Sequence, residues 1–219
     1  MKLVHVDISR QINFDESMNY ALAIENSQEF YRLTAQFVGQ CNGEQGDFAL
    51  YDGQLIDIAK SCLVFYDYYS DVLSSKKATN AVQTQIVDIL KNNDFIEDFS
   101  NLNVLIANIN EKILEKTDLP ISCLDEIDYE NFTKMMGYKA SKSQSLVDDI
   151  LSFVQLNMTG KTKVVAFIGL CDVLSQQQTQ SLLKMLNYMQ LKVLLIESHI
   201  KYKLEQCETV IVDEDLCVI

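Results

Sequence analysis

Residues 164–196 read VVAFIGLCDVLSQQQTQSLLKMLNYMQLKVLLI, and this stretch decides the fold class. Both of its ends, VVAFI at 164–168 and VLLI at 193–196, are continuously apolar, which is typical of strands covered on both faces. Between them, apolar side chains recur at helical spacing at Leu182, Leu183, Leu186 and Met189. A strand, a helix and a second strand at this spacing predict a parallel pair joined by a right-handed crossover.

A strand followed by a helix is also predicted near the beginning of the chain. Residues 20–24 (YALAI) form a short apolar run, and Asn26 with Glu29 resembles a capping box. Further strands are predicted at 48–51, 62–66 and 209–212, and residues 1–10 (MKLVHVDISR) also have the pattern of a strand. That first segment lacks the long apolar run of a secretory signal, and no run of about 18 apolar residues occurs. A soluble, cytoplasmic protein with no membrane partner is therefore expected.

The middle of the chain has a helical pattern throughout. Apolar residues recur at helical spacing in four segments of 74–158, and the single proline, Pro120, separates the second segment from the third. These patterns predict an α/β protein with a mostly parallel sheet. Its head domain is expected to comprise residues 1–73 and 159–219, with a helical domain at 74–158 inserted into it.

Residues 23–32 (AIENSQEFYR) join the first apolar strand to its helix, where a nucleotide-binding protein of this class carries its phosphate loop. The segment has no glycine and no Lys followed by Ser or Thr. A phosphate loop needs glycines so that backbone N–H groups can approach the phosphates, and a lysine to meet their charge. Glu25 and Glu29 would instead repel a triphosphate. Nucleotide hydrolysis at this position is not expected.

Patterns for other kinds of catalysis are also missing from the sequence. The two histidines, His5 and His199, lie outside motifs such as HExxH, and no GxSxG occurs, so we predict structural histidines and no enzymatic activity. The six cysteines are scattered without a CxxC pair, which excludes zinc and favours buried free thiols. Cys62, Cys171 and Cys217 lie within or beside apolar runs.

The charges are distributed unevenly along an acidic chain, whose net charge is -13. Residues 94–130 carry ten acidic residues against two lysines, whereas residues 131–203 carry nine lysines against four acidic residues. An acidic total disfavours phosphate binding, but a basic stretch within it can still contact nucleic acid. Solvated helix faces explain the same two stretches equally well.

An acidic cluster lies where a long predicted helix ends, Pro120 breaks the chain and a new helix begins. Carboxylates gathered at such a junction repel one another unless a hard cation with oxygen ligands neutralises them. No EF-hand spacing occurs, so calcium or magnesium competes with helix capping and solubility as the explanation. The members of the cluster are Glu115, Asp118, Asp125, Glu126 and Asp128.

The order of these features resembles a known family, the short form of the Csn-type proteins of type II-A CRISPR loci. The resemblance is carried by residues 161–198, the acidic tail VDEDLCVI at 212–219, and DEIDYENFTKMMGYK at 125–139. It implies a head similar to a degenerate P-loop ATPase and a homotetrameric ring around duplex DNA, chiefly at DNA ends. It also implies partners in spacer acquisition, namely the integrase subunits and the RNA-guided nuclease of the same locus. Calcium would bind at Glu115, Asp118, Asp125 and Glu126.

Lysines near the predicted domain junction are the candidates for DNA contact. They lie at the ends of predicted elements: Lys76, Lys77, Lys139, Lys142, Lys161 and Lys163. Lysines from four copies would line one hole, so an acidic protein could still present a positive lumen. The alternative is an acidic scaffold subunit that binds proteins and never contacts DNA. A nucleotide-dependent enzyme ranks last.

Overall fold

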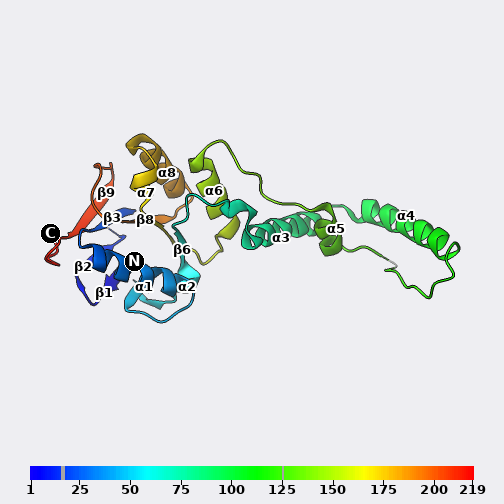
Figure 1. Cartoon of the computed structure of the whole chain (residues 1–219), viewed down its shortest axis with the longest axis horizontal. Helices are drawn as coiled ribbons and strands as arrows, with labels where there is room; N and C mark the ends of the chain where they lie inside the picture. The colour runs from blue at the N-terminus through cyan, green and yellow to red at the C-terminus, as the bar shows by residue number, and fades with distance from the viewer. Residues whose placement is uncertain (16–17, 125) are drawn as a thin grey trace. The chain divides into compact units, whose positions relative to one another are not determined.

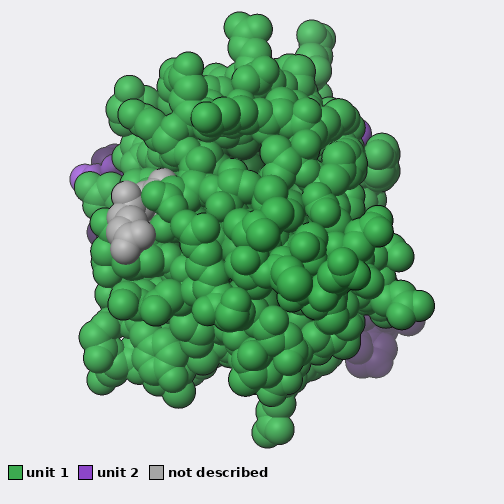
Figure 2. Space-filling view, turned by 90° about the vertical axis from the view of Figure 1, so that its left-hand side faces the viewer, with its two compact units in different colours: residues 1–70, 143–219 green, residues 71–142 purple. Residues whose placement is uncertain are grey.

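The computed structural model describes residues 1–15, 18–124 and 126–219. The chain divides into two compact units (Figures 1 and 2). Unit 1 comprises residues 1–70 and 143–219, and unit 2 comprises residues 71–142. In the part of the chain that is described, no helix combines the length and the apolar composition needed to cross a membrane.

Unit 1 is built on a five-stranded, all-parallel sheet, as the apolar runs predict. The strand order is β6 (Cys62–Phe65), β7 (Val164–Ile168), β8 (Lys192–Glu197), β3 (Asn19–Ile24) and β9 (Cys207–Val212). The first parallel strand along the chain, β3, therefore lies between the last two, with Ala23 opposite Glu197 of β8 and opposite Ile211 of β9. The mixed α/β class and the parallel sheet are confirmed.

Helices cover both faces of this sheet, which explains why its strands are apolar without alternation. One face packs on α1 (Ser27–Cys41) through Leu33 and Phe37, in a core that also contains α2 (Ile58–Ser61). The other side carries α7 (Leu170–Val173) and α8 (Gln176–Tyr188), as Figure 1 shows. The capping box of Ser175 and Gln178 begins α8, and its side chains Leu182, Leu183 and Leu186 are buried.

A second, antiparallel sheet belongs to the same core as α1. Its order is β2 (Ile8–Asn13), β1 (Lys2–His5), β4 (Phe48–Asp52) and β5 (Gln54–Ile56). The expectation of one strand over residues 1–10 was therefore wrong: β1 and the beginning of β2 form an antiparallel pair joined by a short turn. Leu3, Ile12 and Leu50 on its inner face join the core.

The helix α6 (Leu146–Asn157) belongs to unit 1, although the sequence placed it in a helical domain at 74–158. Its buried side chains Val147, Ile150 and Val154 explain this assignment, and Phe153 packs edge-on against Phe65 of β6 with centroids 4.9 Å apart. Periodicity identified the helix but not the surface on which it packs. The boundary therefore lies after residue 142 and not after residue 158.

Unit 2 contains a short 3-10 helix, η1 (Val72–Ser74), and the helices α3 (Lys76–Asn92), α4 (Ile96–Leu114) and α5 (Tyr129–Met136). Phe99 of α4 packs edge-on against Tyr129 and Phe132 of α5, with centroids 4.4 and 5.1 Å apart. Gly137 ends α5 with a left-handed backbone (φ +65°), a conformation that favours glycine. None of the residues of α4 is fully buried, and Phe99 is only partly covered by its aromatic neighbours.

Candidate phosphate, nucleic-acid and metal sites

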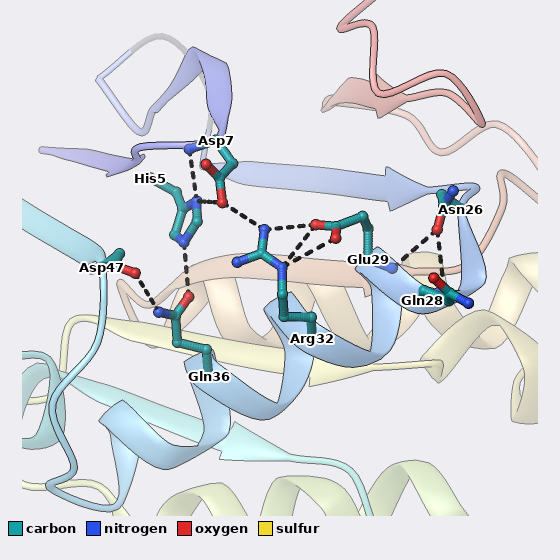
Figure 3. Close-up of polar contacts among 8 residues, drawn as sticks. All are labelled: His5, Asp7, Asn26, Gln28, Glu29, Arg32, Gln36 and Asp47. Carbon is teal, nitrogen blue, oxygen red and sulfur yellow. Dashed lines mark hydrogen bonds and ion pairs between the residues drawn. The ribbon is translucent and has the colours of Figure 1, made fainter.

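The junction between β3 and α1 is too short and too well capped to hold a phosphate. Only two residues, Glu25 and Asn26, separate the strand from the helix. The side-chain oxygen of Asn26 accepts hydrogen bonds from the backbone N–H groups of Gln28 and Glu29, both at 3.1 Å (Figure 3). These are the amides that a phosphate would need. The helix thus binds its own cap in place of an anion.

The one basic side chain in this network, Arg32, is held by carboxylates. Its guanidinium donates to Glu29 at 2.6 Å and to Asp7 at 2.5 Å (Figure 3). These two partners raise the pKa of Arg32 above its usual value, with the hydrogen bond to Glu29 as the largest cause. Two carboxylates around one guanidinium leave a negative excess, which repels a phosphate chain.

His5 has a structural role beside this network, as the sequence predicts. Its Nδ1 accepts from the backbone N–H of Asp7 at 3.1 Å, so the ring proton lies on Nε2. Nε2 then donates to Gln36 at 2.8 Å, and Gln36 donates to Asp47 at 2.8 Å (Figure 3). The ring is buried and packs against Phe48 with centroids 4.4 Å apart. His199 contacts the hydroxyl of its neighbour Ser198 at 2.9 Å.

Four of the six candidate lysines belong to unit 2. Lys76 and Lys77 are the first two residues of α3, directly after the cap Ser75, and the first turn contains no acidic residue. Lys139 and Lys142 follow α5 in the segment that leads out of unit 2. All four are exposed, and none forms a salt bridge within the described ranges of the chain. The pKa of Asp71, lowered first by its hydrogen bond to Ser74, is also lowered by Lys142.

The other two candidate lysines belong to unit 1, and one of them is already paired. Lys161 is exposed in the turn before β7. Lys163 forms a salt bridge with Asp52 of β4, which lowers the pKa of that carboxyl group. The charge of Lys163 is therefore compensated within the chain, so Lys161 is the freer of the two.

The described members of the acidic cluster do not form a ligand shell for a metal ion. Glu115 caps the carboxyl end of α4, and Asp118 and Glu126 are exposed in the segment that follows. Asp125 lies outside the described residues. Among residues 1–15, 18–124 and 126–219, no three His, Cys, Asp or Glu side chains are placed to hold a metal. By themselves, the described carboxylates therefore do not fit a calcium shell of six or more oxygens.

Asp128 has the capping role that the sequence left open. Its carboxylate accepts from the backbone N–H of Asn131 at 2.6 Å at the beginning of α5. Two asparagines of α4 hold the segment before it: Asn110 donates to the carbonyl of Leu124 at 3.0 Å, and Asn103 accepts from Ile127 at 2.9 Å. A hollow of about 510 Å³ lies beside this segment, lined in part by Glu111, Glu115 and Cys123.

The structure also contains a buried carboxyl group that sequence reasoning missed. Glu197 ends β8, the residue is 2% exposed, and its carboxylate accepts from the backbone N–H of Cys171 at 3.1 Å. Burial is the main cause that raises its pKa to about 7. The signal in the sequence was an acidic residue directly after the apolar run 193–196.

All six cysteines are free thiols. Cys62 and Cys171 are buried, as expected, but Cys217 is exposed, because it follows a turn in the tail beyond β9. Burial raises the pKa of the Cys171 thiol to about 12, so this thiol is a weak nucleophile at neutral pH.

No family model matches this chain, and no curated protein matches it.

Proposed function

We propose that this chain is a non-catalytic protein that binds duplex DNA without sequence preference, chiefly at DNA ends. Its place would be CRISPR spacer acquisition, as a homotetrameric ring stabilised by calcium, with the integrase subunits and the RNA-guided nuclease of the same locus as partners. The family resemblance of residues 125–139, 161–198 and 212–219 suggests this role. The same proposal includes a head domain that resembles a degenerate P-loop ATPase. Two observations support it: the parallel sheet, and the Asn26 side chain that takes the place of a phosphate at the helix amides after β3.

The observation that carries DNA binding is the amino end of α3. Lys76 and Lys77 are its first two residues, where the helix dipole is already positive, the first turn holds no acidic residue, and neither lysine has an ion pair in the described chain. Two cations at this end destabilise a free helix, and a phosphate would offset that cost. Lys139 and Lys142, in the same unit, are also exposed and without a salt bridge in the described chain. Phosphate contacts of this kind carry no sequence information.

The observation that favours assembly is the apolar surface of α4. Leu105, Ile109 and Ile113 follow one another at four-residue spacing and are 60%, 56% and 51% exposed. A stripe of this kind is typical of a helix that packs on another helix. The first turn of α4 is acidic, with Glu97 and Asp98, whereas its last turn carries both Glu111 and Lys112. The apolar stripe, and not a charge pattern, therefore carries the proposed contact with α4 of a second copy.

The deciding experiment compares linear with closed circular duplex in gel shifts, with and without calcium, on a sample of measured mass. We expect salt-dependent binding of the linear duplex, weaker binding of the closed circle, and no turnover of ATP or GTP. Failure to bind linear duplex at low salt with calcium present would refute the DNA-binding proposal. Hydrolysis above background would refute the non-catalytic one.

The assembly is tested separately by Leu105→Glu/Ile109→Glu, with Ser100→Glu/Ala107→Glu as the matched control on the same helix. Ser100 and Ala107 are exposed and lie on the face of α4 opposite to the apolar stripe, so the control adds the same charge outside it. Light scattering should give a smaller mass for the first variant and the unchanged mass for the control. Equal masses for all three proteins would exclude the α4 stripe from the interface.

The second candidate function is an acidic scaffold that binds proteins and not DNA. The net charge of -13 and the paired state of Lys163 favour it. This candidate predicts an assembled protein of the proposed mass that leaves linear duplex unshifted at low salt.

A further inference from the structure

The carboxyl group of Glu197 is buried and has no ion-pair partner in the described chain. Lys201, the nearest lysine along the sequence, pairs with Asp172 at 3.6 Å, and His199 is engaged by Ser198. A buried carboxylate without a counter-charge is unstable relative to its protonated form.

The groups that act on the pKa of Glu197 from the elements packed against it are neutral or acidic: the thiol of Cys171 in α7, the phenols of Tyr68 after β6 and Tyr202 after β8, and the carboxylate of Asp172. Two basic residues, His199 and Lys201, line the hollow beside Glu197, and Lys201 pairs with Asp172 at 3.6 Å. Burial is the main cause of its raised pKa, and Asp172 adds to the effect, while amides at the beginning of α7 oppose it. The environment therefore favours the protonated side chain at and below neutral pH.

A small hollow lies directly beside this carboxyl group. Its lining includes Glu197, Cys171 and Cys207, and His199, Lys201, Tyr202 and Leu204 of the following segment. Its volume of about 10 Å³ is close to the space that one water molecule needs. An ionised Glu197 needs more water than this hollow can hold.

The segment 198–206 forms the outer wall of the hollow, and we name it the flap. It has no helix or strand of its own and is held mainly by α7, α8 and the loop between them. Gln176 donates to the carbonyl of Lys203 at 2.7 Å, and Gln180 bonds both backbone groups of Glu205 at 3.1 and 2.8 Å. The hydroxyl of Tyr202 donates to the carbonyl of Leu174 at 3.0 Å. A few side-chain hydrogen bonds of this kind allow local opening without unfolding of the sheet.

We propose that the flap is a pH-sensitive element: when Glu197 loses its proton, its carboxylate draws water into the hollow and the flap loosens over Cys171 and Cys207. The proton leaves to solvent, and no other bond changes. The closed state requires the neutral carboxyl group, and the open state hydrates the anion. Ionisation therefore biases a local two-state equilibrium, in the way that buried titratable groups do in known pH switches.

The test is hydrogen exchange of the flap amides at about pH 5.5 and about pH 8, corrected for the intrinsic pH dependence of exchange. With a carboxyl pKa of about 7, protection of the flap should fall by about tenfold between the two conditions. Glu197→Gln keeps the shape of the side chain and its hydrogen-bond acceptor but has no charge, so the flap of this variant should be equally protected at both pH values. Protection in β3, the reference strand, should not change in either protein.

The matched control is Asp172→Asn, which removes the carboxylate of the surface pair with Lys201. If this control abolishes the pH dependence and Glu197→Gln does not, the surface pair controls the flap and the proposal is wrong. Equal protection of the native flap at both conditions also overturns it. Should Glu197→Gln fail to fold, the ¹³C shift of the Glu197 carboxyl group in the native protein decides. A midpoint below about pH 5.5 would overturn the proposal.

Discussion

The amino ends of α1 and α3 both have a side-chain cap on their free backbone amides, but the charges around the two ends are opposite. At α1, Asn26 caps two amides, Glu29 lies in the first turn, and Arg32 is shared between Glu29 and Asp7. At α3, Ser75 caps the N–H of Ala78, and the next two residues are Lys76 and Lys77. The cap at α1 therefore binds two amides and is surrounded by carboxylates, whereas the cap at α3 binds one amide and is followed by two exposed lysines.

This difference separates position in the fold from function. The end of the first parallel strand is where an α/β protein places a phosphate, yet here the side chains exclude one. In contrast, unit 2, whose helical architecture does not by itself predict a phosphate site, has two lysines at the amino end of α3. We therefore propose the amino end of α3 as the anion site from residue chemistry and not from topology.

The largest effect is expected at Glu197, because the carboxylates around α1 are compensated and this one is not. Its folded pKa of about 7 is above the usual value, so the folded state holds a proton that the unfolded chain releases. Stability is thus full at low pH and falls as the pH rises through the folded pKa. Glu197→Gln should raise the unfolding free energy by roughly 3 kcal/mol at about pH 8 and hardly at all at about pH 4. Urea denaturation at both conditions measures this, and a gain of equal size at both would contradict it.

Reversal of the charges at α3 tests the comparison directly. Lys76→Glu/Lys77→Glu should weaken binding to linear duplex by about 30-fold at low salt and reduce the salt slope, because phosphate contacts are lost. The matched control is Lys91→Glu/Lys184→Glu, which makes the same charge change at exposed lysines in the last turn of α3 and in α8. Fluorescence anisotropy over a series of salt concentrations measures both variants. An equal loss of affinity for both would show a general charge effect, with no site at the amino end of α3.

The parallel sheet could be predicted because burial on both faces makes its strands continuously apolar. The antiparallel sheet could not, since the turn after His5 contains neither glycine nor proline and the first residues read as one strand. The partner of α6 was also hidden, because an apolar stripe shows that a helix packs but not on what.

The sites were harder to predict than the fold, because they depend on contacts between distant residues. Asp52 compensates Lys163 across 111 positions of sequence, which no local pattern reveals. Glu197 is buried between Cys171 of α7 and the flap, whereas an acidic residue at the end of a strand is ordinarily exposed. In contrast, the expectation that residues 23–32 hold no phosphate rests on local residues alone, and the Asn26 cap on Gln28 and Glu29 that supports it lies within one helical turn.

The two caps provide a smaller and more local test. Asn26→Ala removes hydrogen bonds to Gln28 and Glu29, and Ser75→Ala removes one to Ala78. Each should reduce the unfolding free energy by about 1 kcal/mol. Only Ser75→Ala should also affect DNA binding, because it alters the helix end that carries Lys76 and Lys77. A loss of affinity in Asn26→Ala alone would reverse the assignment of the anion site.

The smallest effect concerns cations at the acidic junction of unit 2. If the proposed calcium site exists, the protein should melt at a higher temperature in calcium than in magnesium at equal ionic strength. Magnesium binds such a site less well because it requires octahedral coordination and releases its waters reluctantly. The described carboxylates form no shell by themselves, so we expect a modest shift of a few degrees, about 1 kcal/mol. Melting in EGTA, calcium and magnesium measures it, with Asp118→Asn and Glu126→Gln beside the native protein.

The paired carboxylates at α1 are the control for this experiment. Asp7→Asn changes a carboxylate that Arg32 already compensates, so it should leave the calcium shift intact. The two junction variants should reduce the shift if their oxygens bind the ion. Equal shifts in calcium and magnesium would indicate screening of repulsion among exposed charges, as for any salt. In that case the cluster caps helices and solvates the surface, and calcium has no part in the assembly.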